Sequence, residues 1–139
     1  MLKITIPVNP IGKGRPRSNK FGVVYTPKTT KENQKEIRHH LHMVMNLNKS
    51  LSLKFPLEFI NKLKIEFYLK RPKRLMRKKD PEERIPHIST PDVDNLLKQI
   101  FDSGEGFLWV NDKTIYQLEV SKWYHEKTGN PRIEIEIDV

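Results

Sequence analysis

Three aspartates and one lysine stand out in this chain of 139 residues, because their types and spacing suit metal and phosphate chemistry. Asp92 and Asp94 lie two residues apart, and Lys98 follows four residues after Asp94. Two carboxylates held that close repel each other, and one takes up a proton unless a cation neutralises the pair. Mg²⁺ is the expected cation, since it prefers hard oxygen ligands and takes one or two carboxylates together with the phosphates of a substrate.

The two carboxylates can converge on one ion only if Asp92 precedes the helix that contains Asp94. Positions two apart on a helix do not face each other, whereas in extended chain they point the same way. Thr90 and Pro91 support this placement, because proline keeps the preceding residue out of helical geometry and is favoured near a helix start. The residues that follow have apolar side chains at helical spacing, namely Val93, Leu96, Leu97, Ile100 and Phe101.

Asp112 and Lys98 complete the candidate site. Asp112 comes after a glycine-containing turn that is expected to fold it back toward the start of the helix, where it would be the third ligand. Lys98 is placed to donate to a scissile phosphate, stabilise the transition state or assist the leaving oxygen. A reading without metal stays open. In it, the helix dipole alone favours Asp94, and Asp94 with Lys98 is an ordinary ion pair worth about 0.3–0.5 kcal/mol.

Positive charge is concentrated in two loop-like segments. The chain has a formal net charge of +9, with nine basic and two acidic residues in positions 1–38 and seven basic residues without an acid in positions 70–79. Gly12, Gly14 and Pro16 interrupt the first segment and Pro72 interrupts the second, which is typical of loops. Flexible lysines and arginines in this arrangement suit a phosphate backbone, although solvated loops kept soluble by charge have the same composition. The residues expected to contact DNA are Lys13, Arg15, Arg17, Lys20, Lys28, Arg71, Lys73, Arg74 and Arg77.

Several classes of protein are disfavoured. No apolar run approaches the roughly 18 residues needed to cross a bilayer, and no signal sequence precedes Pro7, so a cytoplasmic protein without membrane contact is expected. Cysteine is absent, which excludes disulfides, thiolate zinc sites and cysteine nucleophiles and fits a reducing compartment. The segment Gly12–Gly14 lacks the spacing of a nucleotide-binding loop, so no nucleotide cofactor is expected.

The elements that must position these residues follow from hydrophobic periodicity. Strands alternate apolar and polar residues, and helices repeat apolar residues every three to four positions. The expected order is a strand Leu2–Ile6, a short strand 23–25, a helix from about Lys31 to Asn46 capped by Thr29 or Thr30, a strand 62–69, a long loop 70–89, a helix from near Pro91 to Asp102, and strands 114–123 and 132–139. This order predicts one α+β domain, with two main helices packed on one face of a small mixed β-sheet.

Several of these segments together resemble the RusA family of Holliday junction resolvases, which includes many phage and prophage members. The segments are 91–98 (PDVDNLLK), 109–112 (WVND), 12–17 (GKGRPR) and 25–29 (YTPKT). The resemblance implies that Asp92, Asp94 and Asp112 are the metal-binding catalytic acids and that Lys98 is the catalytic lysine. One position departs from the family pattern, since Asn111 stands where members often carry another acid, so the role of a fourth carboxylate is lost.

The resemblance further implies a homodimeric endonuclease that depends on Mg²⁺, with Mn²⁺ as a substitute, and acts in DNA recombination and repair. Such an enzyme binds four-way DNA junctions and cuts them by paired, symmetric nicks. Two alternatives remain from the residues alone. One is a DNA-binding protein without catalysis, in which the acids cap a helix; the other is a general structure-selective nuclease that acts on flaps or forks.

Overall fold

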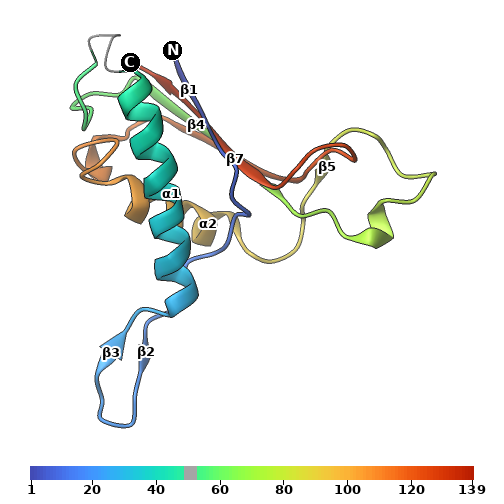
Figure 1. Ribbon diagram of the computed structural model, residues 1–139, viewed down its shortest axis with the longest axis horizontal. Coiled ribbons are helices and arrows are strands. Elements are labelled where there is room, and N and C mark those ends of the chain that lie inside the picture. Colours follow the sequence, from blue (N-terminus) through green and yellow to red (C-terminus); the bar gives the residue numbers. More distant parts are fainter. Residues whose placement is uncertain (49–52) are drawn as a thin grey trace.

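Two helices lie on one face of a five-stranded mixed sheet (Figure 1), which confirms the predicted α+β class. The computed structural model describes residues 1–48 and 53–139. In chain order, the elements are β1 (Leu2–Ile6), β2 (Arg17–Ser18), β3 (Val24–Tyr25), α1 (Lys28–Leu47), β4 (Lys62–Leu69), η2 (Lys73–Leu75), β5 (Ile85–Pro86), α2 (Val93–Gly104), η3 (Asp112–Thr114), β6 (Leu118–Tyr124) and β7 (Arg132–Asp138).

The strand order places β4 at the centre of the sheet, which runs β1-β7-β4-β6-β5. β4 pairs antiparallel with β7, opposite Ile135 at Ile65, and parallel with β6, opposite Val120 at the same residue. A parallel pair needs a long crossover, and the chain between β4 and β6 contains α2. The topology therefore places α2 on one face of the sheet, within the connection that leads from β4 to β6.

Alternation along the strands builds the core. β1 and β7 bury every second residue, and all apolar side chains of β4 are buried. The helices complete the core with apolar residues spaced three to four apart, and each fully buried aliphatic side chain contributes on the order of 1.5–3 kcal/mol. The most buried core residues are Ile6, Ile37, Leu41, Ile60, Leu63, Ile65, Phe67, Leu96, Leu108, Trp109, Ile133, Ile135 and Ile137.

A buried polar contact sets how α2 lies against α1. Gln99 in α2 is only 1 % exposed, and its Nε2 donates to the backbone oxygen of Thr30 at 2.9 Å and to Oδ1 of Asn33 at 3.1 Å. A buried amide without partners would cost about 1–3 kcal/mol, so this contact favours a single register between the helices. That register determines where the first turn of α2 lies.

The element boundaries differ from the predicted ones at several positions, and β5 lies within the segment 70–89 that was predicted as loop. The first helix begins at Lys28 after Pro27, and Thr30 does not cap it, because its side-chain oxygen accepts a hydrogen bond from the Gly14 backbone instead. Positions 17–18, predicted as loop, pair with β3 as a short hairpin. The strand predicted to begin at position 114 begins at Leu118, because the preceding residues form the η3 turn.

Two segments project from the sheet and helices (Figure 1). The β2–β3 hairpin extends beyond the start of α1, and residues 70–86, here called the basic arm, extend from the other side beyond the end of β4. The basic arm corresponds to the predicted long loop. It contains the η2 turn, and most of its residues lie outside helices and strands. No helix in residues 1–48 and 53–139 is both long and apolar enough to cross a membrane.

Candidate active site

The start of α2 holds the two neighbouring aspartates as predicted. Asp92 is the residue before the helix and has extended backbone angles, with φ −70° and ψ 154°. Its backbone oxygen accepts the first helical hydrogen bond, from Leu96 at 3.1 Å, but its carboxylate caps no backbone N–H of the helix. The Asp92 carboxylate is therefore not committed to the helix. Asp94 lies in the first turn, where the partial positive charge of the helix end favours an acid.

These acids form one wall of a groove that we call the α2 groove. Asp92, Asp94, Asn95 and Lys98 line one side, and residues 13–16 line the other, around a volume of about 430 Å³. Lys98 Nζ lies 3.9 Å from a carboxylate oxygen of Asp94, and both side chains are more than half exposed. The α2 groove thus presents two carboxylates, a lysine and an arginine, Arg15, to solvent in one place.

Glycines allow the basic loop to approach the helices closely enough to form the groove. The backbone N–H of Lys13 donates to the Asn95 oxygen at 3.2 Å, and that of Gly14 donates to Thr30 Oγ1 at 3.0 Å. A Cβ on Gly14 would lie 2.8 Å from that hydroxyl oxygen, and one on Gly12 would lie 3.1 Å from the Pro91 side chain. The sequence segment 12–14 therefore acts in packing. Thr30 was missed as a positioning residue, and only its contacts in the folded chain, with Gly14 of the loop and Gln99 of α2, show this role.

Asp112 is not in the α2 groove, contrary to the prediction that it folds back beside Asp92 and Asp94. The indole Nε1 of Trp109 donates to its carboxylate at 2.8 Å, and its own backbone N–H donates to Glu105 at 3.2 Å. Glu105 follows the last turn of α2, about 16 Å from Asp94 along the helix axis at 1.5 Å per residue. Among the residues that the structure describes, no three acidic or histidine side chains are close enough to share an ion.

The physical reason for this correction is the packing of Trp109. Its ring is fully buried against Gly104, where an added Cβ would lie 2.8 Å from the ring. This contact fixes the turn after α2 at the end of the helix, and the indole N–H then holds Asp112 there. Asn111 caps the η3 turn by accepting a hydrogen bond from the backbone N–H of Lys113 at 3.0 Å.

The environment of Asp112 perturbs its acidity. Partial burial raises its pKa to about 6, and the neighbouring Glu105 carboxylate adds to the increase, while the Trp109 hydrogen bond opposes it. The same contact lowers the pKa of Glu105, because the Asp112 side chain and backbone donate to its carboxylate. The pair therefore holds one proton below about pH 6, and perturbed acidities of this kind are more frequent at functional sites than elsewhere.

Most of the residues expected to contact DNA have exposed side chains. Lys13 is an exception in part, because its Nζ is 2.6 Å from Asp102 and its side chain is only one-third exposed. The others, except the buried Arg71, lie on the loop 13–16 that lines the groove, on the hairpin, at the start of α1 and on the basic arm. The exposed residues of the set are Arg15, Arg17, Lys20, Lys28, Lys73, Arg74 and Arg77.

Arg71 is the clear correction within that set. It is 4 % exposed, and its guanidinium donates to the backbone oxygens of four residues, namely Leu75, Pro81, Glu83 and His125. Arg71 therefore holds the two ends of the basic arm together, with four of its five N–H donors used and its guanidinium buried away from a phosphate. Composition placed it among the DNA-binding residues because a buried and an exposed arginine in a charged loop look alike in sequence.

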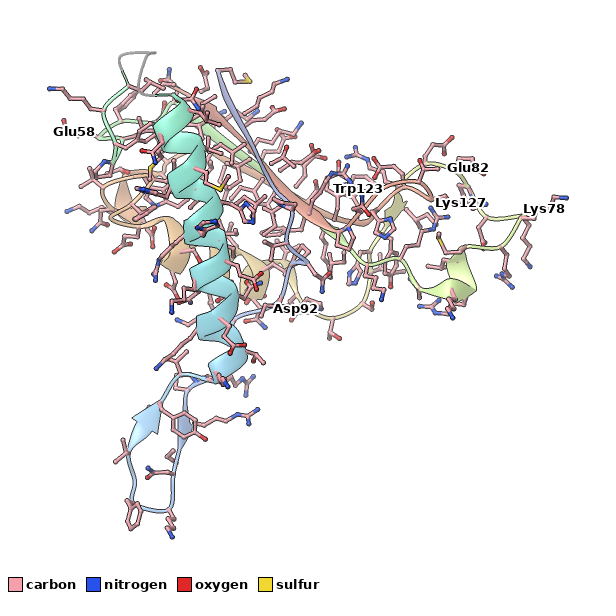
Figure 2. All side chains as sticks on the ribbon, in the orientation of Figure 1. Glu58, Lys78, Glu82, Asp92, Trp123 and Lys127 are labelled. Carbon is pink, nitrogen blue, oxygen red and sulfur yellow. The ribbon has the colours of Figure 1, made fainter. Side chains whose placement is uncertain are left out.

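The basic arm is held in place and carries its charge outward. Lys127, in the turn after β6, donates to the Arg77 backbone oxygen at 2.7 Å. Lys78 lies at the tip of the arm, and Asp92 lies between the arm and the lower part of α1 in the view of Figure 2. The exposed cations of the arm and hairpin thus lie on two sides of the α2 groove.

Comparison with known proteins agrees with this arrangement. The family model described as Endodeoxyribonuclease RusA matches residues 7–138, nearly the whole chain. A relative in Bacillus subtilis (strain 168), the uncharacterized protein YqaN, is 25 % identical over 142 residues, which cover 98 % of this chain and 94 % of that protein. Because the family match spans the hairpin, the α2 groove, the basic arm and every strand of the sheet except β1, this chain belongs to the RusA endodeoxyribonuclease family.

Proposed function

We propose that this protein is a Mg²⁺-dependent endonuclease that resolves four-way DNA junctions by paired, symmetric nicks. The observation that carries the proposal is the α2 groove, where Asp92, Asp94 and Lys98 face a basic loop across one solvent-filled space. A groove for a small acidic or neutral ligand would not need exposed cations on two flanking projections. A phosphodiester backbone uses all of these features at once.

The residues present fit a divalent metal ion. The Asp92 carboxylate has no helix-capping bond, and that of Asp94 has only a long contact to Lys98, so oxygen atoms of both are available. We propose that these two aspartates hold Mg²⁺, or Mn²⁺ in its place, since such sites need only one or two carboxylates. When bound, the ion would supply an activated water and neutralise charge on the phosphate.

The other residues of the groove have roles that follow from their positions. Lys98, one turn along α2 from Asp94, would donate to a non-bridging oxygen of the scissile phosphate and so stabilise developing charge. Arg15 on the opposite wall would hold a neighbouring phosphate, with the geometry that guanidinium offers to phosphate oxygens. For Asp112 we propose a part in cleavage from its match to the second acidic position of the family alone, since within one chain it lies at the other end of α2 and does not share the ion of the α2 groove.

We also propose that two copies of the chain act together. A four-way junction has two equivalent strands to cut, and a two-fold dimer would present two α2 grooves and two sets of basic arms to it. Paired, symmetric nicks in recombination and repair intermediates would follow from that symmetry. The competing candidates are a DNA-binding protein that does not cut and a nuclease that cuts flaps and forks equally well.

Substrate comparison tests the proposed function. Radiolabelled four-way junction, flap and linear duplex of matched sequence are incubated with the protein and Mg²⁺, and initial cleavage rates are compared. The proposal requires that the junction is cut fastest, by at least about tenfold, which corresponds to about 1.4 kcal/mol. Equal rates on all three DNAs would favour the general structure-selective nuclease, and binding without cleavage of any would favour the non-catalytic protein.

Substitution of Asp112 is expected to stabilise the protein at high pH while impairing cleavage. Because the native pKa of about 6 exceeds the ordinary value of 3.8, the native state holds a proton that the unfolded state releases between these values. Stability therefore falls as pH rises through this window and stays lower above it. The difference corresponds to at most about 3 kcal/mol, which we reduce to about 1 kcal/mol because Glu105 shares the proton and solvent screens the pair.

Urea unfolding of Asp112→Asn and wild type at pH 8 and pH 5 measures this effect. The variant should be more stable by about 1 kcal/mol at pH 8, with a smaller gap at pH 5, and should cut junctions about 10²-fold more slowly. Glu105→Gln serves as the matched variant, because it removes the other carboxylate of the pair. A variant at position 112 that is less stable than wild type at pH 8 would contradict the assigned acidity.

Arginines 71 and 74 are expected to separate DNA binding from the integrity of the basic arm. Arg74→Ala should weaken junction affinity severalfold and reduce the slope of log affinity against log salt concentration by about one. The free energy of unfolding should not change. Arg71→Ala should lower the free energy of unfolding by about 2 kcal/mol, since it leaves four backbone oxygens without their partner. Binding titrations at several salt concentrations and urea unfolding measure the two effects. Lys3→Ala, on β1 far from both projections, is the control, and an unchanged salt slope in Arg74→Ala would remove the arm from the DNA-binding surface.

A further inference from the structure

A second pocket lies directly beside the α2 groove. It has a volume of about 470 Å³, within the range of about 300–1,000 Å³ found for small-ligand sites. Gly12 and Pro91 line this pocket and pack closely against each other. Pro91 lines the pocket and the next residue, Asp92, lines the α2 groove, so the chain at these two residues separates the two spaces. We call it the inner pocket. Consecutive Cα atoms are 3.8 Å apart, so the two spaces are separated by little more than one residue of the chain.

The inner pocket contains an unsatisfied histidine. His87 lines it and is only 5 % exposed. Among buried side-chain nitrogen and oxygen atoms in residues 1–48 and 53–139, His87 Nδ1 is the one without a hydrogen-bond partner. Such an orphan atom costs on the order of 1–3 kcal/mol, and native proteins retain few of them. Because His87 lines a ligand-sized pocket, a partner that enters this pocket and shifts the ring slightly would satisfy the buried Nδ1 atom.

The surroundings of His87 keep its ring fixed and uncharged. Its ring centroid is 4.6 Å from that of Tyr124, and its Nε2 lies 3.5 Å from the Ser89 hydroxyl oxygen. Burial lowers the pKa of His87, and the positive charge of Lys122 lowers it further. A neutral imidazole offers one donor and one acceptor, so with Nε2 beside Ser89 the Nδ1 atom is available to read a polar edge.

The remaining wall suits a flat aromatic ligand with a charged attachment. Ile11, Leu69 and Pro10 supply apolar surface, and Asn9 and Thr90 add polar groups. Lys70, exposed at the start of the basic arm, supplies a positive charge. A nucleobase has two apolar faces and a polar edge and is joined to a phosphate, which matches this combination.

Resting on the proposed function, we propose that the inner pocket receives one unstacked DNA base next to the scissile phosphate and that His87 reads the edge of that base. Unstacking costs a few kcal/mol in a duplex and least where the base is already unpaired, as at a branch point. The pocket thereby supplies a preference for branched DNA and a preference for the nucleotide at the cut. His87 is in this account a specificity-determining residue and not a residue of the chemical step.

Cleavage of a set of junctions that differ only in the nucleotides at the crossover tests the reading of the base. Wild type should show a spread of rates of about tenfold or more, because one good polar contact to a base gives discrimination of this order. His87→Phe keeps a ring of similar shape and should reduce the spread to about twofold with unchanged junction affinity. His39→Phe, an exposed histidine on α1, should behave as wild type. A His87→Phe variant that keeps the wild-type ranking of sequences would overturn the proposal.

A binding measurement distinguishes failure of this inference from failure of the proposed function. Junctions that carry 2-aminopurine or pyrrolocytosine at each crossover position are mixed with the Asp94→Asn protein, and fluorescence reports unstacking without cleavage. The signal should rise at one position and be lost in Asn9→Phe, which fills the pocket from its rim and serves if His87→Phe does not fold. If the wild-type protein never cuts DNA but the fluorescence still rises at one position and Asn9→Phe abolishes that rise, the inner pocket takes a base in a protein that only binds DNA. If no position brightens, the inner pocket does not take a base, whatever the cleavage assay gives.

Discussion

Asp94→Asn protein is expected to bind a four-way junction at least as tightly as wild type and to cut it about 10³-fold more slowly. The loss reflects removal of one of two proposed carboxylate ligands, which costs about 4 kcal/mol of transition-state stabilisation. Binding should survive because many exposed cations share the electrostatic attraction to phosphate. In buffer without Mg²⁺ the affinity should even increase slightly, since one negative charge in the α2 groove no longer repels the DNA.

Cleavage and binding are measured on the same labelled junction, by gel assay with Mg²⁺ and by titration without it. Glu58→Gln is the matched control, because it makes the same chemical change at an exposed acid far from Asp92 (Figure 2). The control should cut and bind as wild type. Parallel loss of cleavage and binding in Asp94→Asn would mean that the residue maintains the groove and takes no part in the reaction.

Lys98→Ala is expected to lower the cleavage rate about 10²-fold and junction affinity by less than threefold. A single donor aimed at developing charge contributes about 2.7–4 kcal/mol in a preorganised site, whereas one lysine among many contributes little to overall phosphate binding. Its exposed ion pair with Asp94, at 3.9 Å, adds at most about 0.5 kcal/mol to stability, so the fold should be unaffected.

Single-turnover cleavage, titration of binding and urea unfolding separate these three effects for Lys98→Ala. Lys35→Ala, an exposed lysine on α1, matches the change in charge and in helix propensity. It should leave the cleavage rate unchanged. Equal losses of rate and affinity at Lys98 would assign it to DNA binding alone and remove it from the chemical step.

Periodicity was sufficient to predict the main elements of the fold. The strands that alternate strictly, β1, β4 and β7, have boundaries within a residue of the prediction, and α2 has the expected apolar stripe. The hairpin at Arg17–Ser18 was not predicted, because two-residue strands leave no pattern to detect. The shift in β6 arose from η3, a turn whose hydrogen bonds depend on Asn111 and therefore on local side-chain chemistry.

The candidate site was predictable where it depends on local sequence and not where it depends on packing. Asp92 precedes the helix, as the D-x-D spacing and the preceding proline require. The location of Asp112 depends on Trp109 packing against Gly104, a contact that no spacing rule contains. Arg71 shows the same limit, since only the folded chain brings four backbone oxygens around its guanidinium.

Cleavage of a mobile four-way junction by the wild-type protein, with and without Mg²⁺, tests the central claim most directly. Added Mg²⁺ is expected to produce two nicks at symmetric positions on opposite strands. Omission of the ion or addition of a chelator should abolish these nicks, and Mn²⁺ should restore them. A protein that binds the junction tightly but leaves both strands intact in Mg²⁺ and in Mn²⁺ would contradict the central claim.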